Sequence, residues 1–276
     1  MLCASSLIFF TYFQPAFCGD ADGTEDNQST RSAARSQNIY IDLSTAYATI
    51  PANAFSLGFR NFTFATSASS QNIFLDAPLT VDLSDSISIY GGVSASASQS
   101  DPSQWTPLTV YSWNVGFSAD ILEQSGLLPG VSVQSTFTKT TSGSSIAATG
   151  SSTVLEMDYA LNEDQTEGVI AGVKYTAIFP DLNFVKIAPS YVGYVGAYYQ
   201  WPSNWKLTGR AGIQSFGGAQ IGPLQSKEFT QPIVRVNFDR MDDNDNTLFG
   251  ISVDVAWTPK PIFQLTLSTP IYAVRN

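Results

Sequence analysis

The feature that most constrains this chain is a regular alternation of apolar and polar residues, which is clearest between Val185 and Phe216. In the second half of this stretch, apolar or small residues occupy every other position: Trp205, Leu207, Gly209, Ala211 and Ile213. A period of two is typical of a β-strand, because successive side chains of a strand point to opposite faces. The residues between the two halves, Pro202-Ser203-Asn204, favour a turn. The stretch therefore predicts a β-hairpin.

Similar alternating segments follow one another towards the C-terminus, beginning with a segment at residues 55–64. Turn-forming residues separate these segments, and none of them shows helical periodicity. No apolar run reaches the length of about 18 residues that a transmembrane helix needs. The pattern predicts an all-β fold, an antiparallel up-and-down barrel of about twelve strands, within a range of about ten to fourteen.

Composition limits the chemistry that such a fold can carry out. The chain has no histidine, and its net charge is -10, with 13 Lys+Arg against 23 Asp+Glu. Without an imidazole it has neither a Ser-His-Asp nor a Cys-His nucleophile and no histidine-ligated zinc, so we predict no enzymatic activity. Serine–lysine and paired-carboxylate chemistry stays open. The acidic balance argues against nucleic acid as a partner, since binding it requires clustered Lys and Arg.

The N-terminal region differs in pattern from the rest of the chain. Residues 1–21 combine a short apolar run with small residues, and we predict a signal peptide cleaved after Cys18 or Ala21. A lipid anchor on Cys18 and a plain N-terminal strand are the alternatives. Because Cys3 and Cys18 are the only cysteines, we expect no disulfide framework, and we predict no cofactor. Residues 22–54 are predicted to be a polar lead-in, and residues 55–276 the β-barrel.

Two architectures accommodate these strands, and they differ in what meets the apolar face. In a soluble sandwich or small barrel the apolar face is the core, and the polar face is usually rich in charge. In a transmembrane barrel the apolar face meets lipid, and small polar residues suffice inside. Here charged residues make up only 13% of the chain. Many segments also reach the length of about 10 residues that a tilted transmembrane strand needs, so a transmembrane barrel is favoured.

Aromatic residues lie near the ends of the predicted strands, on the apolar face. This is the placement of the aromatic girdles that mark the two interfaces of a membrane barrel. The predicted membrane-interface residues are Trp113, Tyr159, Phe179, Tyr199, Trp201, Trp205 and Trp257.

Repeated amphipathic hairpins, such as VDLSDSISIYGG and YYQWPSNWKLTGRAG, give the chain a resemblance to Gram-negative outer-membrane β-barrels over the range Phe55 to Asn276. The resemblance implies export to the outer membrane, contact with outer-membrane lipid and passage of small solutes. Barrels of this class commonly end on an aromatic residue, whereas this chain ends Tyr272-Ala273-Val274-Arg275-Asn276. Either Tyr272 takes that role from an internal position, or the class assignment is wrong.

Seven charged residues fall on the face opposite the apolar one, which is the predicted lumen face: Glu156, Asp158, Lys174, Lys206, Arg210, Arg235 and Asp254. They are interpreted either as a pore lining that selects solutes by charge or as ion pairs that fill a closed interior. The acidic turn from Asp242 to Asn246 offers oxygen ligands for calcium but lacks the glycine and distal glutamate of an EF-hand loop, so we predict no metal site.

The loops give a predicted orientation. Long connections at Gln99 to Thr106, Thr140 to Ser151 and Gly217 to Glu228 are expected on the outside. Short turns at Ser84 to Ser86 and Pro202 to Asn204, with the acidic turn at Asp239 to Asn246, are expected on the periplasmic side. The functional prediction is a narrow porin-like channel or a structural membrane protein. The alternative is a secreted or periplasmic soluble β-barrel or sandwich that binds a ligand.

Overall fold

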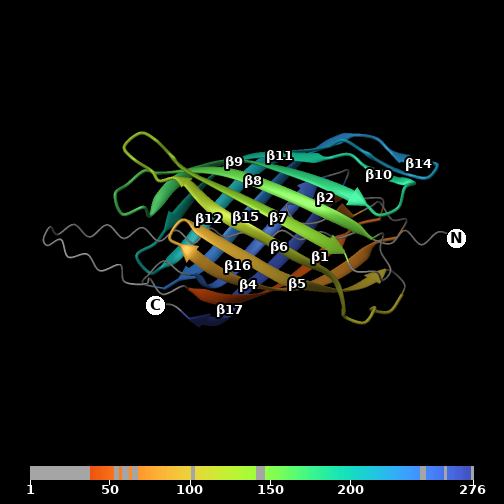
Figure 1. The fold of residues 1–276 in the computed structure, drawn as a ribbon, viewed down its shortest axis with the longest axis horizontal. Coiled ribbons are helices and arrows are strands. Elements are labelled where there is room, and N and C mark those ends of the chain that lie inside the picture. Colours follow the sequence, from red (N-terminus) through yellow and green to blue (C-terminus); the bar gives the residue numbers. More distant parts are fainter. Residues whose placement is uncertain are drawn as a thin grey trace, which may run out of the picture.

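Twelve antiparallel strands close into a barrel (Figure 1). The computed structural model describes residues 38–52, 56–57, 62–63, 68–100, 103–140, 147–242, 247–257 and 260–274. In ring order the barrel strands are β1 (Ile39–Ile50), β17 (Pro261–Val274), β16 (Thr247–Trp257), β15 (Phe229–Met241), β12 (Trp205–Phe216), β11 (Ser190–Gln200), β9 (Glu167–Pro180), β8 (Ala148–Ala160), β7 (Gly130–Thr140), β6 (Thr109–Leu122), β5 (Ile87–Ser100) and β4 (Ser70–Ser84). The predicted all-β, antiparallel up-and-down barrel of about twelve strands is confirmed.

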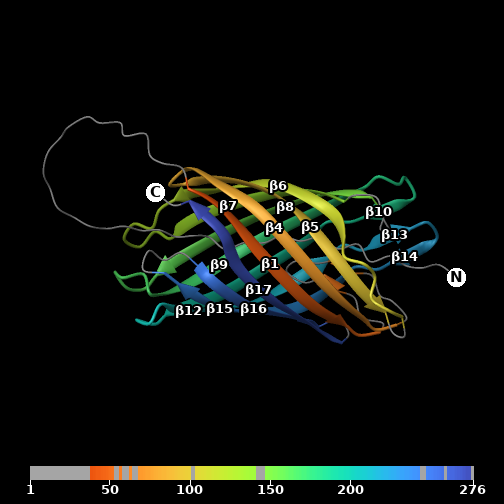
Figure 2. The same cartoon turned by 90° about the horizontal axis from the view of Figure 1, so that it is seen from below.

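The ring closes where the first strand meets the last. β1 pairs with β17 from Ile39↔Val274 to Thr49↔Phe263, and its other edge pairs with β4 (Figure 2). Every other barrel strand pairs with the strands before and after it along the barrel. The strands are 11 to 15 residues long. They are therefore about twice as long as strands in ordinary soluble proteins.

The predicted boundary between the lead-in and the barrel is wrong, because β1 lies within residues 22–54. Its apolar contrast is weak: Thr45 and Thr49 point outward, while Ala46 and Ala48 point inward and are buried. Of the segment predicted as the first strand, residues 55–64, the described part consists of β2 (Ser56–Leu57) and β3 (Phe62–Thr63), which pair with each other and not with a described barrel strand. The predicted signal peptide, residues 1–21, lies outside the described residues.

The first arm of the predicted hairpin is also shorter than its alternation indicated. β11 begins at Ser190, and the residues before it form a separate short strand, β10 (Val185–Ile187). Pro189 lies between the two strands and has no N–H to donate to a ladder, so the strand is interrupted there. β10 pairs with β13 (Ala219–Ile221), which pairs with β14 (Leu224–Ser226), in a region predicted as loop. Figure 1 shows this small sheet beyond one end of the barrel.

The two ends of the barrel differ in the length of their connections. Five connections of seven residues or more, 51–69, 101–108, 141–147, 181–189 and 217–228, lie at one end, called here the loop end, together with the three-residue connection 258–260. The other end, called the turn end, has connections of two to seven residues, 85–86, 123–129, 161–166, 201–204 and 242–246. The predicted grouping of long loops and short turns on opposite ends is confirmed. Which end faces the cell exterior stays a prediction.

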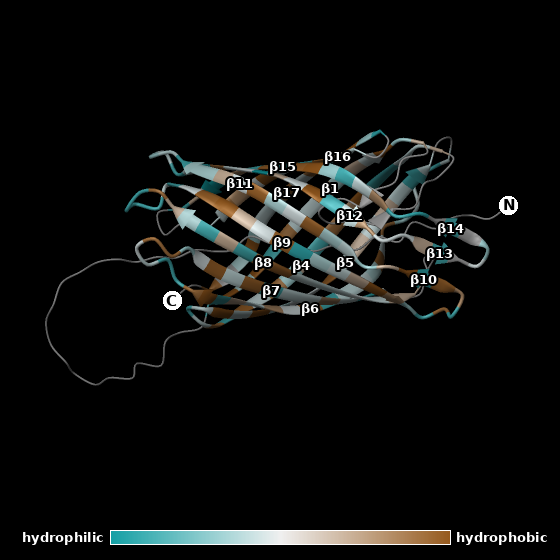
Figure 3. Ribbon diagram, turned by 90° about the horizontal axis from the view of Figure 1, so that it is seen from above, coloured by the Kyte–Doolittle hydropathy of each residue, from teal (hydrophilic) through white to brown (hydrophobic). Residues whose placement is uncertain are grey.

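Along each strand, exposed apolar side chains alternate with buried ones, so the barrel has an apolar outer face. Figure 3 shows hydrophobic and hydrophilic bands alternating around the wall. Exposed outer-face residues include Val115, Phe117, Leu155, Met157, Val173, Tyr191, Val195, Ile213, Val253 and Leu265. Their strand neighbours, such as Gly116, Glu156 and Lys174, point inward. In the described part of the chain, no helix has the length and apolarity to span a bilayer.

Candidate functional site

The candidate site is the inner face of the barrel, where all seven predicted lumen-face residues lie in the inward phase of their strands. Glu156 and Asp158 come from β8, Lys174 from β9, Lys206 and Arg210 from β12, Arg235 from β15, and Asp254 from β16. In the ring, β8, β9, β11, β12, β15 and β16 are consecutive neighbours. These charges therefore occupy one continuous half of the wall.

Glu156 and Arg210 form an ion pair that crosses two intervening strands. Nη2 of Arg210 lies 3.2 Å from Oε1 and 3.3 Å from Oε2 of Glu156. The Tyr194 hydroxyl donates to Oε2 of the same carboxylate at 2.5 Å. β9 and β11 lie between the two charged residues, so this contact runs along the inside of the wall. Glycines at Gly172 and Gly196 leave the space over which the side chains reach.

Tyrosine rings lie flat on the wall over glycines of the neighbouring strand. Tyr194 is directly opposite Gly172, and Tyr198 is directly opposite Gly168. A Cβ atom built on either glycine would come within 2.5 Å of the tyrosine ring that covers it. Such aromatic cover compensates for the missing side chain of a strand glycine. Tyr90 covers Gly116 in the same way, between β5 and β6.

Arg235 and Asp254 form the most buried ion pair described. They lie opposite each other on β15 and β16, with Nε to Oδ1 at 2.5 Å and Nη2 to Oδ2 at 3.0 Å. Arg210 is in turn directly opposite Arg235. Two guanidinium groups are therefore neighbours on the wall, and each of them has a carboxylate on its far side. Paired contacts of this type are strong because both partners are charged and the geometry is bidentate.

The remaining predicted charges lie closer to the turn end or beside these pairs. Nζ of Lys206 lies 4.5 Å from the centre of the Tyr198 ring, a cation–π contact. Lys206 is also directly opposite Asp239, an inward acidic residue that the prediction did not include. Asp158 lies opposite Ile170, and Lys174 lies opposite Val192 and Val154. Sequence patterns identified the face of each residue, but the tyrosine partners depend on register and could not be found.

Towards the loop end the inner face carries apolar clusters among buried polar side chains such as Gln214 and Gln231, and these clusters were not predicted. Phe216, 1% exposed, packs with Ile178, Ala148 and Ala219. A second group places Phe74, also 1% exposed, against Ala46 and Ala48. Two further clusters contain Val192, Ile233 and Ala256, and Ile50 and Ile262. Part of the inner face is therefore packed like the core of a soluble protein.

The predicted interface aromatics separate into two groups, one near each end. Tyr159, Tyr199, Trp201 and Trp205 lie at or beside the turn-end tips of their strands, and Trp113, Phe179 and Trp257 lie towards the loop end. At the turn end, the rings of Trp205 and Phe238 stack with centroids 4.5 Å apart, and Trp201 meets Phe238 at 6.2 Å. Sequence analysis did not single out Phe238.

The distance between the two groups can be derived from strand geometry. Tyr159 is opposite Val169 on β9, and Phe179 lies ten residues further along that strand. Ten residues at about 3.3 Å each extend about 33 Å, which a tilt of about 40° reduces to about 25 Å along the axis. This is the height of the apolar band in membrane barrels, about 25 Å.

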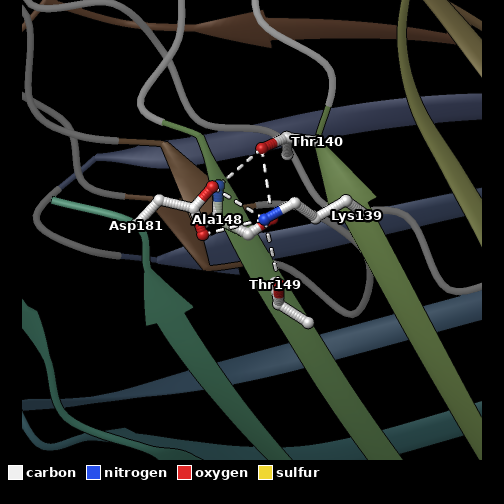
Figure 4. A network of polar contacts seen from close by, with 5 residues as sticks. All are labelled: Lys139, Thr140, Ala148, Thr149 and Asp181. Atoms are coloured by element: carbon white, nitrogen blue, oxygen red, sulfur yellow. Dashed lines mark hydrogen bonds and ion pairs between the residues drawn. The ribbon is translucent and has the colours of Figure 1, made fainter.

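A charged contact lies on the wall at the loop-end rim (Figure 4). Nζ of Lys139 contacts Oδ1 and Oδ2 of Asp181 at 2.8 and 2.7 Å, and Oγ1 of Thr149 at 3.3 Å. Lys139 is directly opposite Trp113. A charge next to an aromatic ring at this level is typical of the boundary between an apolar band and a polar rim.

The described residues contain no group of three or more acidic or cysteine side chains placed to hold a metal ion. Of the acidic turn considered for calcium, Asp242 is described and residues 243–246 lie outside the described part.

No protein-family model and no curated protein matches this chain by sequence. Solved structures with a similar fold do exist. An outer membrane channel from Pseudomonas putida F1 matches with a TM-score of 0.56 at 11% identity, over 88% of this chain and 100% of that chain. The transport unit of the autotransporter AIDA-I from Escherichia coli matches with a TM-score of 0.50 at 9% identity, over 87% of this chain and 92% of that chain. At these identities the likeness concerns the fold.

Proposed function

We propose that this chain is an outer-membrane β-barrel that forms a narrow channel for small solutes and has no catalytic activity. The observation that carries the proposal is the apolar outer face of a closed twelve-stranded ring. A soluble protein rarely exposes such a large apolar surface, whereas a membrane barrel requires it. The two aromatic groups about 25 Å apart support the same location. Signal-directed export, with the loop end outside, belongs to this proposal.

The inner face supports a channel in preference to a purely structural barrel. An interior that only has to be filled is best built from apolar side chains, because buried charges lose hydration. Here the middle of the wall carries Glu156, Arg210, Arg235 and Asp254. Tyr194 and Tyr198 lie along the wall over glycines, which keeps their rings from projecting towards the axis. Twelve strands give a lumen between that of a filled eight-stranded barrel and an open porin.

The membrane location is tested by fractionation. The full chain, expressed with its N-terminal segment in a Gram-negative host, is expected in the outer-membrane fraction and is expected to need detergent for extraction. Recovery in the aqueous periplasmic fraction would instead favour the alternative, a soluble β-protein that binds a ligand.

The channel is tested with the purified barrel in a planar lipid bilayer. We expect discrete conductance steps in potassium chloride that are smaller than those of a sixteen-stranded porin, because lumen width grows with strand number. A barrel that inserts, as judged by heat-modifiable migration on a gel, but shows no steps at any potential would be structural and not a channel.

A further inference from the structure

We propose that the inner face holds a binding site for a monovalent cation of the primary ammonium type, centred on Asp76 of β4. The proposal deepens the channel function, on which its consequences for transport rest, by naming the class of solute. It follows from the distribution of charge around the ring and from a row of buried hydroxyl groups.

Four neighbouring strands, β1, β4, β5 and β6, form an acidic wall. Every charged residue in these strands is an aspartate, and none is Lys or Arg. The aspartates are Asp42, Asp76, Asp82 and Asp120, all in the inward phase. No cation from these strands offsets the negative charge of the wall.

The rest of the inner face has a different balance. Arg210 is paired with Glu156 and Arg235 with Asp254, while Lys206 lies opposite Asp239. Positive and negative side chains therefore alternate on β8 to β16, and their fields cancel over short distances. The acidic wall faces this balanced half, since six ring positions separate β4 from β11. A cation inside the barrel is accordingly drawn towards β1, β4, β5 and β6.

Asp76 lies in a row of serines at matching register on consecutive strands. Ser44 is opposite Asp76 on one side, Ser94 is opposite it on the other, and Ser112 follows Ser94. All three serines are 1% exposed. The hydroxyl of Tyr111, which is also buried, bonds to Ser94 and Ser112 and interacts with Asp76, whereas the Oγ atom of Ser44 has no hydrogen-bond partner among the described residues. Buried hydroxyls nearly always have a partner, so the Ser44 hydroxyl beside the Asp76 carboxylate points to a ligand that this polar cluster holds. Directly opposed side chains have Cβ atoms about 5 Å apart, within reach of one small group.

The chemistry of this row fits a single positive charge. A primary ammonium group has three N–H donors, and the row offers one carboxylate and several hydroxyl oxygens as acceptors. Divalent cations usually take several carboxylates as ligands, whereas only Asp76 carries a charge in this row. Asp76 is the seventh of 15 residues in β4, and Ser44 the sixth of 12 in β1, so the row lies near mid-height of the wall. A solute that crosses the barrel passes this level.

The transport consequence is tested by reversal potential in a gradient of potassium chloride, using the full chain in planar bilayers. We expect cation selectivity, and we expect Asp76→Asn to lower the potassium-to-chloride permeability ratio by roughly twofold or more. Asp181→Asn removes the same charge from the loop-end rim and serves as the matched control, for which no change in the permeability ratio is expected. An anion-selective wild type, or an Asp76→Asn variant that keeps the wild-type ratio, would overturn the acidic wall as a cation path.

The hydroxyl row is tested separately from the charge. Ser44→Ala/Ser94→Ala keeps Asp76 but removes two acceptors. Methylammonium chloride is expected to slow the potassium current of the wild type at lower concentration than tetramethylammonium chloride, which has the same charge but no N–H. The double variant is expected to lose this difference. If the variant keeps the difference, or if the wild type shows none, the wall attracts cations by charge alone and the site does not exist.

Binding can also be measured without transport, which separates this proposal from the channel function. Calorimetric titration of the detergent-solubilised full chain with methylammonium chloride is expected to show binding that Asp76→Asn and Ser44→Ala/Ser94→Ala abolish. A parallel titration with sodium chloride distinguishes an ammonium group from an alkali metal ion. Binding of methylammonium without conductance steps would contradict the channel function but support the site. Conductance steps without binding would support the channel function and contradict the site.

Discussion

The loop-end part of the inner face differs from the part between the middle and the turn end in how its side chains are stabilised, although the same strands form both. Towards the loop end the inward side chains are uncharged and closely packed and include apolar clusters, as at Phe216 and Ile233, which are each 1% exposed. Towards the turn end they are charged or phenolic and paired with one another, as at Glu156, Tyr194 and Arg210. One strand contributes to both: β12 carries Lys206 and Arg210 in its turn-end half and ends at Phe216. The difference shows that alternation determines which face a residue occupies, while the chemistry of that face changes along the axis.

This contrast makes the two parts respond differently to mutation. A packed apolar region is stabilised by burial and dispersion, so truncation leaves a cavity. A charged region is stabilised only while each ion pair is complete, because loss of one partner leaves the other as an uncompensated buried charge. Four substitutions test whether the division is real, in order of decreasing expected effect.

The largest effect is expected from Arg235→Met in the charged part. Asp254, 6% exposed, would lose both of its contacts to the guanidinium and remain as an unmatched buried charge. We expect a loss of about 4 kcal/mol in the free energy of unfolding, measured by urea titration of the barrel in detergent micelles. The double variant Arg235→Met/Asp254→Leu is expected to recover most of this loss. A single-variant loss below about 1 kcal/mol would mean that water hydrates this level well.

A smaller loss in the free energy of unfolding, about 3 kcal/mol, is expected from Ile233→Ala in the packed loop-end part. Ile233 packs with Val192 and Ala256, so its truncation leaves a cavity between them. Ile213→Ala provides the control, since this side chain lies on the outer face and is 60% exposed. Urea titration under the same conditions compares the two variants. Equal losses for both residues would show that the loop-end interior is no better packed than the outer surface.

Gly172→Ala tests the flat placement of Tyr194 and is expected to cost about 2 kcal/mol, because the new methyl group would overlap the ring. Gly193→Ala is a matched control on the next strand, where a Cβ atom meets nothing within 4 Å. Thermal unfolding followed by tryptophan fluorescence measures both variants. If the ring turns away at no cost, the stabilities will agree, and the single-channel conductance of Gly172→Ala should instead fall.

The smallest effect is expected from Lys139→Gln at the loop-end rim. Lys139 and Asp181 have side chains that are 33% and 44% exposed, so solvent screens their attraction. A change below about 0.5 kcal/mol in the same urea titration is expected, in contrast to the buried pair of Arg235. A loss comparable to that of Arg235→Met would show that exposure does not separate the two kinds of ion pair in this barrel.

Much of the architecture was accessible from sequence because each long strand exposes one face to apolar surroundings. The faces of Glu156, Arg235 and Asp254 followed directly from period two. β1 was missed because Ala46 and Ala48 face inward and Thr45 and Thr49 outward, which weakens the contrast that alternation depends on. Register cannot be read from one strand, so neither the covering of Gly172 by Tyr194 nor the row at Asp76 was predicted. The apolar clusters of the loop-end interior were missed because an apolar inward residue next to an apolar outward one interrupts the alternation and gives no separate signal.

The contact between β1 and β17 has a consequence for how the barrel forms. All other barrel neighbours are close in sequence, whereas this seam joins residues near opposite ends of the described chain, as at Ile39↔Val274. Loop closure of that length is slow and comes after local hairpins have formed. Until then both outer strands are open edges that can pair with other chains, and in lipid their backbone groups would lack partners. Pairing of β1 with β17 is therefore expected to be the last step of assembly, in which a curved sheet of hairpins becomes a closed barrel without open strand edges.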